Sequence, residues 1–442
     1  MIILIKYLMD SFSELPHINK AFFGKVKQLL KMIPNNFKDL NNIFFDGKSK
    51  FFDEIDKKHR EEGEEFFKVY PYFQDLALNI EKLLPETIPL LKKKEKGILE
   101  LTRKQVGLLF FLSFFNLIDL KQEKGLKKAR FAVFQILFSL TQTKFEFGRC
   151  FLNYLTIIGK WLSGNNIILE EKIKYIRDTH KLDFKNIDKE TKLCEIQIYD
   201  KGSLFCGKSS YFTDFANKHI GGGVLEGGCV QEEILFTIAP EAIISMFFME
   251  VMSEIDAIRI DNIIQYSNYS GYGHKFEFKG CAIDINNINI IKKNKIIAID
   301  ASIQETDFFG NFEKKEIKRD IRKAFVGFNL VNFENEKNEE KSIGTGNWGC
   351  GVFGGDHELK FFQQWIAASF AGIERLDYYT FGEKEMKYII QKIDKIKLKY
   401  KEAYKLYAKL ISNKLSSGKV AKIIYKDNSE QNEDNKCFCF II

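Results

Sequence analysis

The spacing of apolar residues divides the chain into two parts. In residues 1 to about 190, apolar positions recur at intervals of three and four, as through Gln105–Ile118 and Phe131–Leu140, which predicts helices. From about 194 to 382 they gather in short runs, separated by glycine clusters and further helical segments. Strands that alternate with helices predict an α/β sheet with helical cover. The runs that predict strands are Glu195–Tyr199, Ile234–Ile238, Lys295–Ile299 and Leu376–Phe381.

The two ends of the chain have their own patterns. Apolar residues recur at helical steps from Met386 to Ile411, which predicts one long amphipathic helix with a lysine-dense outer face. Beyond it, Lys426–Lys436 is polar and acidic, and its lack of apolar residues predicts disorder. At the N-terminus, Met1–Met9 is apolar but contains Lys6 and precedes no small-residue cleavage site, which favours a core helix over a signal peptide.

These patterns predict three regions. We expect a helical accessory region over residues 1–190, an α/β domain over 191–415 that ends in the long helix, and a disordered tail over 416–442. The longest apolar run, Val106–Phe115, is shorter than the ~20 residues of a membrane span, so no transmembrane segment is expected.

Composition narrows the class of protein. Hydrophobic residues make up 45% of the chain and charged residues 29%, which excludes a wholly disordered or fibrous protein. The net charge of +7 arises from 67 basic and 60 acidic residues, a balance that permits an anionic ligand without demanding one. The first six of the eight cysteines form no C-x-x-C pair, and the six histidines form no His-x-x-x-His pair. We expect free thiols in a reducing compartment and no structural metal.

A first glycine cluster lies within residues 211–241. It holds Asp214 and Asn217, then Gly221, Gly222 and Gly223, and then Gln231, Glu232 and Glu233. Consecutive glycines let a sugar or phosphate approach main-chain N–H groups closely, although a flexible hairpin is the simpler interpretation of the glycines alone. Adjacent carboxylates point apart, so Glu232 and Glu233 are candidates for separate roles, one holding a sugar hydroxyl and the other transferring a proton. A solvated strand edge is the alternative, and charge beside a phosphate-sized cradle disfavours it.

A second cluster, residues 344–356, is also rich in glycine. Its last residue, Asp356, is suited to cap a helix that begins near Glu358, which predicts an anion-binding nest at a helix N-terminus. Gly349, Gly351 and Gly354 satisfy the spacing G-x-G-x-x-G of dinucleotide-binding proteins. The preceding segment, 335–341, is charged rather than strand-like, and no G-K-[ST] follows. We therefore expect neither a Rossmann fold nor a P-loop.

Taken together, the motifs resemble those of poly(ADP-ribose) glycohydrolases. The most specific match is the three glycines followed, after a short spacer, by Gln-Glu-Glu. Several independent motifs match in one order along the chain, and the resemblance covers roughly residues 101 to 382. The further matching segments are Leu101–Val106, Asp214–Asn217, Gln265–Ser267, Tyr269–Tyr272, Ala298–Ala301, Lys323–Phe325, Thr345–Asp356 and Tyr379–Gly382.

The resemblance implies a macrodomain-like α/β fold, with a mixed sheet flanked by helices and an N-terminal helical accessory region. It implies hydrolysis of the ribose–ribose O-glycosidic bonds of ADP-ribose polymer on modified proteins, with release of ADP-ribose and without a cofactor. A non-catalytic ADP-ribose-binding macrodomain and a mono-ADP-ribosyl hydrolase are the alternatives. The intact Gln-Glu-Glu disfavours the first, and its spacing from the glycines disfavours the second. We expect a monomer, nuclear or cytoplasmic, with no direct sequence-specific nucleic-acid partner.

The resemblance also assigns roles to residues. Glu233 would donate a proton to the leaving ribose oxygen, and Glu232 and Asn217 would hold ribose hydroxyls. Asp214 matches a position tied to activity, through support of the loop. The positions implied to contact substrate are Gly221, Gly222, Gly223 and Gln231, the aromatic residues Tyr272 and Phe381, and the diphosphate loop of Asn347, Trp348, Gly349, Cys350, Gly351, Val352 and Phe353.

Some positions depart from the family pattern or admit a second interpretation. Leu204 and Phe205 stand where the family often has an acidic residue for adenine, which leaves adenine recognition open. Trp348 fits a stacked base or a packed core equally. Cys150, Cys229 and Cys350 are candidate nucleophiles, but no histidine motif accompanies them, so buried or loop thiols are favoured.

The chemistry of glycoside hydrolysis bears on the paired glutamates. Such hydrolysis needs an acid for the leaving oxygen and a base for water, commonly two carboxyl groups ~5–9.5 Å apart across the sugar. Adjacent Glu232 and Glu233 do not obviously span a sugar, so a single glutamate that acts first as acid and then as base is the simpler mechanism. It needs a carboxyl pKa raised towards neutrality, which a ligand-covered site beside a second carboxylate favours.

The last four residues, Cys439-Phe-Ile-Ile, have the C-a-a-X form of a prenylation signal. The phenylalanine and the final isoleucine fit that form imperfectly. A second cysteine, Cys437, and the lysine-rich helix upstream favour it, because stable anchoring takes two signals. Cys439 is therefore a candidate lipidation site.

Overall fold

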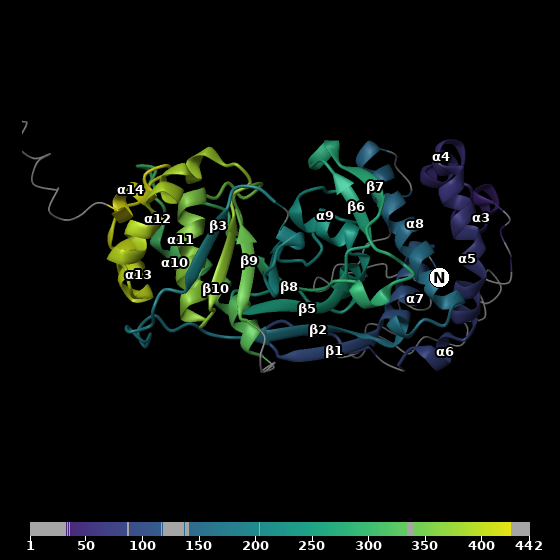
Figure 1. Cartoon of the computed structure of the whole chain (residues 1–442), viewed down its shortest axis with the longest axis horizontal. Coiled ribbons are helices and arrows are strands. Elements are labelled where there is room, and N and C mark those ends of the chain that lie inside the picture. The colour runs from purple at the N-terminus through teal and green to yellow at the C-terminus, as the bar shows by residue number, and fades with distance from the viewer. Residues whose placement is uncertain are drawn as a thin grey trace, which may run out of the picture. The chain divides into compact units, whose positions relative to one another are not determined.

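The computed structural model describes residues 32, 34, 36–85, 88–115, 117, 137, 141–202, 204–333 and 340–425. The chain folds into two compact units (Figure 1). The first comprises the described residues up to Thr179 together with Asp214–Ala298, and the second comprises His180–Thr213 and the residues from Ile299 onward. The predictions for Met1–Met9, for Phe131–Leu140 apart from Leu137, and for the tail beyond residue 425 lie outside the described residues.

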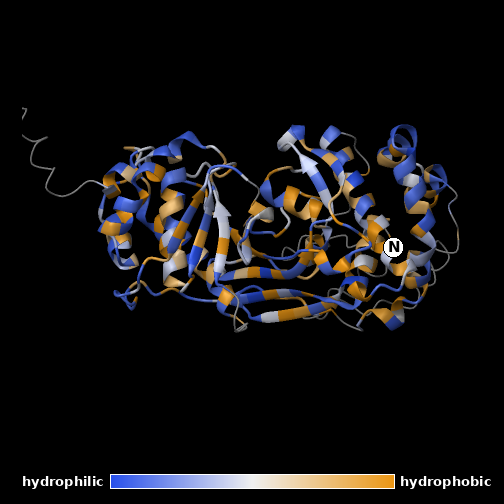
Figure 2. Ribbon diagram, in the orientation of Figure 1, coloured by the Kyte–Doolittle hydropathy of each residue, from blue (hydrophilic) through white to orange (hydrophobic). Residues whose placement is uncertain are grey.

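An antiparallel ladder forms the sheet of the first unit. Its strands pair in the order β1 (Gly97–Thr102), β2 (Lys172–Thr179), β5 (Asp256–Ile264) and β8 (Lys293–Asp300). The predicted strand Lys295–Ile299 lies within β8 and is confirmed. Figure 2 shows apolar residues along β1, β2 and β5. A separate hairpin joins β6 (Ser267–Ser270) to β7 (Glu277–Cys281).

Phenylalanine builds much of the helical core of this unit. The rings of Phe73 and Phe111 stack with centroids 4.8 Å apart, and Phe110 meets Tyr154 edge to face at 5.0 Å. Such aromatic pairs bury large apolar areas in defined geometries, which gives the many phenylalanines of the chain a packing role. The helices are α3 (Phe37–Phe45), α4 (Lys50–Lys58), α5 (Arg60–Leu78), α6 (Ile80–Leu83), α7 (Arg103–Phe114), α8 (Gln142–Ser163) and α9 (Gln231–Ile238).

The strand predicted at Ile234–Ile238 is wrong, because these residues complete the helix α9. All five are buried, so the segment has no polar face whose period would separate a helix from a strand. The helix continues into a 3₁₀ segment, η4 (Pro240–Phe247), whose proline stands in the first turn.

A parallel ladder forms the sheet of the second unit. Its order is β4 (Tyr211–Ala216), β9 (Ser342–Gly346), β10 (Arg375–Tyr379) and β3 (Glu195–Tyr199). The prediction for Glu195–Tyr199 is confirmed residue for residue, and that for Leu376–Phe381 is confirmed except at its end. Phe381 lies beyond β10 with a φ of +54°, in the left-handed region and outside the range typical of strands.

Helices pack with this sheet in the second unit. They are α10 (Lys314–Asn329), α11 (His357–Phe370), α12 (Lys387–Lys399), α13 (Ala403–Ser412) and α14 (Val420–Tyr425). The single long helix predicted over Met386–Ile411 is wrong, because the chain leaves helical geometry at Tyr400. Glu402 there forms a bridge with Lys192, and α13 buries its own apolar side chains, Leu406, Tyr407 and Leu410. Among the described helices, none has both the length and the apolar character to cross a membrane.

A buried ion pair ties the first unit together. Arg103, at the start of α7, pairs with Glu241 of η4, and both side chains are fully buried. The guanidinium also donates to the carbonyl of Asn262 at 3.0 Å and lies 3.4 Å from the partly exposed carboxylate of Glu171. Glu241 accepts the hydroxyl of Tyr266 at 2.6 Å. Burial opposes the charge of Arg103, but the carboxylate of Glu241 raises the pKa of the guanidinium above its ordinary value.

We expect Glu241→Gln to destabilise the protein by about 3–5 kcal/mol, because it leaves the Arg103 guanidinium buried without its counter-charge. Urea denaturation of the variant and the wild type measures the difference. Glu171→Gln, which removes a half-exposed partner of the same guanidinium, is the matched control and should cost less than about 1 kcal/mol. Equal losses in the two variants would contradict a dominant role for Glu241.

Candidate functional site

The N-terminus of α9 holds the first glycine cluster in place. Glu232 accepts two main-chain N–H groups, from Gly221 at 2.6 Å and from Asn217 at 2.8 Å. Gln231, the residue before it, accepts the N–H of Phe215 at 2.8 Å. Charged acceptors make stronger hydrogen bonds to N–H groups than neutral ones do. The path of the chain from β4 into the glycines is therefore set by side chains of α9.

Glu233 holds the other side of the same loop. Its carboxylate accepts the N–H of Gly223 at 2.9 Å and, at the start of its own helix, that of Val230 at 2.9 Å. The two glutamates therefore serve different segments, as their adjacency predicts. A Cβ on Gly222, whose φ is +50°, would collide with Glu233 Oε1 and come within 2.7 Å of Glu232 Oε2. The glycines form a turn around two carboxylates that accept its N–H groups, which disfavours the flexible-hairpin alternative.

A third carboxyl group belongs to this cluster. Asp214, in β4, is fully buried, and within the described part of the chain neither of its oxygens has a hydrogen-bond partner. Burial, followed by the charge of Glu233, raises the pKa of Asp214 well above its ordinary value. Burial and the charge of Asp214 likewise raise the pKa of Glu232, against the lowering effect of its N–H donors. Their burial and crowding therefore favour the protonated forms of Asp214 and Glu232.

The thiols of the site are poor nucleophiles. Burial raises the pKa of Cys229 to about 11 and that of Cys350 to about 12. A thiol with such a pKa stays protonated at neutral pH, where only the thiolate attacks. The preference for non-catalytic thiols agrees with this, and both cysteines are free.

The second glycine cluster links β9 to α11 in the second unit. The segment before it does contain a strand, β9, which begins at Ser342, just beyond the charged residues that led us to expect none. The strand–glycine loop–helix order of an anion-binding turn is thus present. Asp356 caps α11 by accepting the N–H of Leu359 at 2.8 Å, as predicted. Asn347 is held from the side by donation to the carbonyl of Thr380 at 3.1 Å.

The loop leaves main-chain donors available. In the described part of the chain, the N–H groups of Gly349, Gly351, Val352 and Phe353 donate to no protein acceptor. Consecutive unpaired N–H groups before a helix form an anion-binding nest. Gly349 has a φ of +75°, whereas Gly351 has no positive φ and a Cβ on it would meet nothing within 4 Å. Gly351 therefore borders open space.

The remaining predicted site residues differ in exposure. Trp348 is fully buried and donates its indole N–H to the carbonyl of Ile299 at 2.9 Å, so it is a core residue and offers no face to a base. The side chains of Leu204 and Phe205 are also buried. The aromatic residues Tyr272 and Phe381 are 58% and 53% exposed, which leaves them free to contact a ligand.

Sequence reasoning missed a group of buried charges in the second unit. Lys360 of α11 and Asp320 of α10 are buried and paired with one another. The only signal was a lysine inside the apolar run Leu359–Phe362, which the pattern alone does not distinguish from a surface lysine. Among the described residues, no group of three or more His, Cys, Asp or Glu side chains is placed to hold a metal ion.

We expect Asp214→Asn to become more stable relative to the wild type as the pH rises. Folded Asp214 retains a proton that the unfolded chain releases above its ordinary pKa of 3.8, so the wild type loses stability with rising pH until the folded group ionises. The asparagine has no proton to release. Urea denaturation at about pH 5 and about pH 8 measures the effect. A difference between the two proteins that does not change with pH would contradict the raised pKa.

Comparisons with known proteins identify the family of both parts of the chain. The chain matches the poly(ADP-ribose) glycohydrolase macro domain fold over residues 184–388 and the helical domain of the same family over residues 58–175. The predicted fold, an α/β macrodomain with a helical N-terminal region, is thereby confirmed.

Individual relatives are similar over most of the chain. A probable poly(ADP-ribose) glycohydrolase 2 of Arabidopsis thaliana is 30% identical, over 87% of this chain and 85% of that protein. Poly(ADP-ribose) glycohydrolase 1 of the same plant is 30% identical, over 72% of this chain and 70% of that protein. The crystal structure of the poly(ADP-ribose) glycohydrolase of Thermomonospora curvata covers 45% of this chain and 75% of its own, with 14% identity and a TM-score of 0.32. With its two matching domains and its relatives, the chain belongs to the poly(ADP-ribose) glycohydrolase family.

Proposed function

We propose that Glu233 is the proton donor and acceptor of this enzyme, which as a member of its family hydrolyses poly(ADP-ribose). The observation that carries the assignment is the division of labour between the two glutamates. Glu232 spends both oxygens on the N–H groups of Asn217 and Gly221 and is 2% exposed. Glu233 accepts the N–H groups of Gly223 and of Val230, at the start of its own helix, and is 7% exposed. Glu233 is the more exposed of the two carboxyl groups, and we place the leaving ribose oxygen against it.

In this mechanism one carboxyl group acts first in its protonated form, as an acid, and then as the carboxylate, as a base. The Glu233 carboxyl gives its proton to the ribose oxygen that leaves as the glycosidic C–O bond breaks, and positive charge develops on the other ribose. Water attacks that anomeric carbon, and the Glu233 carboxylate takes the proton of the water. The products are ADP-ribose and a polymer shortened by one bond, with the carboxyl group restored. Glu232 and Asn217 hold the ribose hydroxyls, and buried Asp214 supports the loop.

We expect Glu233→Gln to lower turnover at least ~10³-fold, because the amide neither gives nor takes the proton. Its affinity for ADP-ribose should change by less than about tenfold, or ~1.4 kcal/mol, since shape and hydrogen-bonding capacity are kept. Turnover on defined polymer and calorimetry with ADP-ribose are the two measurements. Glu232→Gln should lose affinity as well as rate. Near-normal turnover in Glu233→Gln together with loss of turnover at intact affinity in Glu232→Gln would reverse the two roles.

We infer that ADP-ribose is bound through three further features. The free N–H groups of Gly349, Gly351, Val352 and Phe353 receive the diphosphate, which supplies binding energy remote from the bond that breaks. Tyr272 and Phe381 are both more than half exposed, which leaves each able to contact the nucleotide. The buried side chains of Leu204 and Phe205 leave adenine recognition to other groups, such as the backbone.

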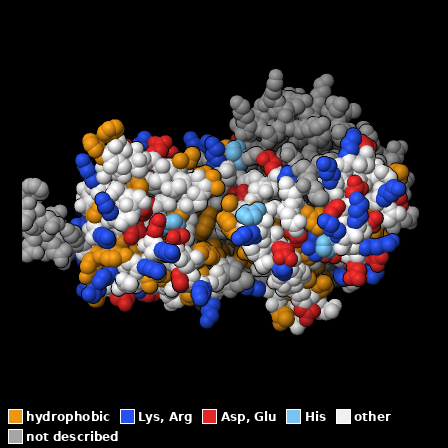
Figure 3. Space-filling view, turned by 90° about the horizontal axis from the view of Figure 1, so that it is seen from above, with side chains coloured by type: hydrophobic (Ala, Val, Ile, Leu, Met, Phe, Trp, Pro, Cys, Tyr) orange, Lys and Arg blue, Asp and Glu red, His pale blue; other side chains and the backbone are white. Residues whose placement is uncertain are grey.

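We propose that the protein works as a monomer on polymer attached to proteins, in the nucleus or cytoplasm. On the face drawn in Figure 3, basic and acidic side chains are interspersed, which does not favour a direct nucleic-acid partner of the kind that a continuous basic face serves. A prenyl group on Cys439 would tether a fraction of the protein to a membrane.

If Cys439 carries a prenyl group, Cys439→Ser expressed in the native cell should move from the membrane fraction to the soluble fraction, because a serine oxygen is not a substrate for prenylation. Fractionation followed by immunoblotting measures the shift. Turnover on polymer, measured with the purified variant, should stay unchanged. Identical partitioning of the two proteins would remove the tether.

A further inference from the structure

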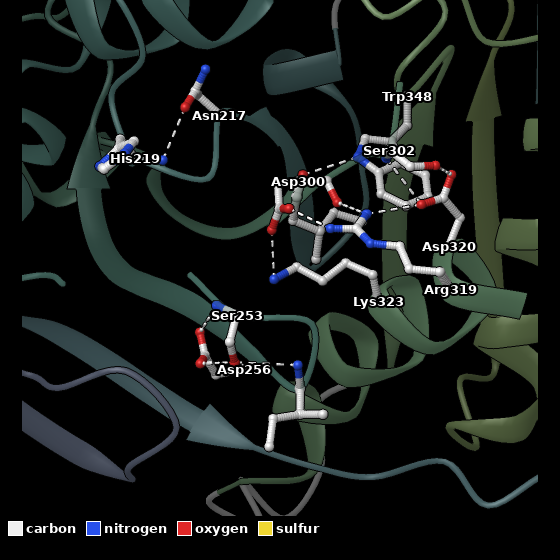
Figure 4. Close-up of polar contacts among 12 residues, drawn as sticks. Asn217, His219, Ser253, Asp256, Asp300, Ser302, Arg319, Asp320, Lys323 and Trp348 are labelled. Atoms are coloured by element: carbon white, nitrogen blue, oxygen red, sulfur yellow. Dashed lines mark hydrogen bonds and ion pairs between the residues drawn. The ribbon is translucent and has the colours of Figure 1, made fainter. Parts of the chain in front are cut away.

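Five charged side chains gather in the second unit, and Figure 4 shows four of them, Asp300, Arg319, Asp320 and Lys323, near Trp348 of the glycine loop. Asp300 stands at the end of β8, Arg319, Asp320 and Lys323 on α10, and Lys360 on α11. Four of them are buried, and the side chain of Arg319 is nearly so. Charges are rarely taken out of water in such number without a function or tight pairing.

The charges form one connected network. Arg319 bridges the two carboxylates, at 2.5 Å to Asp300 and 2.8 Å to Asp320. Lys323 lies 2.6 Å from Asp300, and Ser302 donates its N–H and its hydroxyl to Asp320 at 3.1 and 3.0 Å. The remaining pair, Lys360 with Asp320, closes the network on the side of the loop.

The network carries an excess of one positive charge. Its cations are Arg319, Lys323 and Lys360, and its anions are the carboxylates of Asp300 and Asp320, so that three minus two leaves one. Burial opposes the ionisation of Asp320, but the charges of Lys360 and Arg319 hold its pKa below the ordinary value. A buried excess charge has no water to neutralise it and favours an anion nearby.

Lys360 places that excess beneath the diphosphate loop. Its ammonium lies 4.8 Å from the centroid of the Trp348 ring, in a cation–π contact. A Cβ on Gly349 would come within 3.3 Å of the Lys360 Nζ, and one on Gly355 within 2.7 Å of its Cε. The glycines at both ends of the turn thus pack directly on the lysine side chain. The conformation of the loop therefore depends on the Lys360 side chain packed against it.

A further anion borders the loop. Asp356, between the loop and α11, accepts the N–H of Leu359 at 2.8 Å, the hydroxyl of Ser417 at 2.9 Å and the N–H of Gly418 at 3.1 Å. It also stands at the N-terminus of α11, where the helix dipole offsets a negative charge. Its carboxylate is therefore held in place by its own donors.

We propose that Lys360 is a positioning residue for substrate, and that the diphosphate of bound ADP-ribose supplies the counter-charge that the buried network lacks. The ammonium acts from beneath, through the loop, and does not replace the main-chain N–H groups that contact the phosphates. This inference rests on the proposed role of the loop from Gly349 to Phe353 in binding the diphosphate.

The test compares variants that change the charge of the network in opposite directions. Lys360→Met keeps the length of the side chain and removes the excess charge, and ADP-ribose affinity by calorimetry should fall about tenfold. The KM for polymer should rise similarly, with kcat within about twofold of the wild type. Lys360→Arg, which keeps the charge, should restore most of the affinity. Asp320→Asn raises the excess to two and should tighten binding severalfold.

A double variant separates charge from structure. Lys360→Met/Asp320→Asn removes one cation and one anion, so the excess of one remains while the pair is lost. We expect it to bind ADP-ribose with near-wild-type affinity, whereas a merely structural role for the pair predicts a loss at least as large as that of Lys360→Met. Affinity as weak as that of Lys360→Met would overturn the proposal, and it does so even where Asp320→Asn alone fails to fold.

A further variant distinguishes this inference from the proposed function on which it rests. Gly351→Val places a branched side chain in open space over the loop without backbone strain, so the fold should persist while ADP-ribose affinity falls at least about tenfold. Unchanged affinity would mean that the loop does not bind the diphosphate, and the proposed function of the loop would fail. Weakened binding in Gly351→Val with unaltered binding in Lys360→Met would overturn the role of Lys360 alone.

Discussion

The first unit depends on the contact between Arg103 and Glu241. Neither charge meets water, so each is tolerated only while the other is in place. Through this pair the start of α7 is fixed against η4, and η4 follows α9 directly along the chain. Because α9 presents Glu232 and Glu233 to the glycine cradle, the ion pair supports the segment that carries the proposed catalytic glutamate. The accessory helices are therefore part of the support of the site.

Buried charged side chains support the glycine loop in each of the two units. In the first unit, carboxylates that would be costly to bury are used to hold main-chain N–H groups of a glycine loop. In the second, a buried lysine lies under the other glycine loop. A loop of glycines lacks side chains with which to anchor itself, so its shape is set by charged groups beneath it. The glycines let the main chain approach a ligand closely, and the buried charged side chains fix the conformation of the loop.

The sequence predicted some elements and failed at others for identifiable reasons. Strand β3 was predicted residue for residue, because its short run of alternating residues is bounded by polar segments. The sequence predicts a strand at Ile234–Ile238, where the structure has a helix. A segment that is buried on every side shows neither the helical nor the strand period of polar residues. The break at Tyr400 was missed, since the apolar period runs on across it and only tertiary contact ends the helix. Both glycine clusters were found as cradles, yet the burial of Trp348 and Lys360 depends on packing that no local pattern encodes.

The placement of charge also explains how a protein with balanced surface charge attracts a polyanion. The basic and acidic residues, 67 and 60, nearly cancel, and they are interspersed on the face of Figure 3. Exposed charges are screened by salt within about 10 Å, whereas buried ones are screened much less. If the loop binds the diphosphate as proposed, a buried positive charge beneath it acts on a bound phosphate more strongly than an exposed lysine at the same distance would. Because it acts at one loop only, it favours an ADP-ribose unit seated there over non-specific adsorption of the polymer.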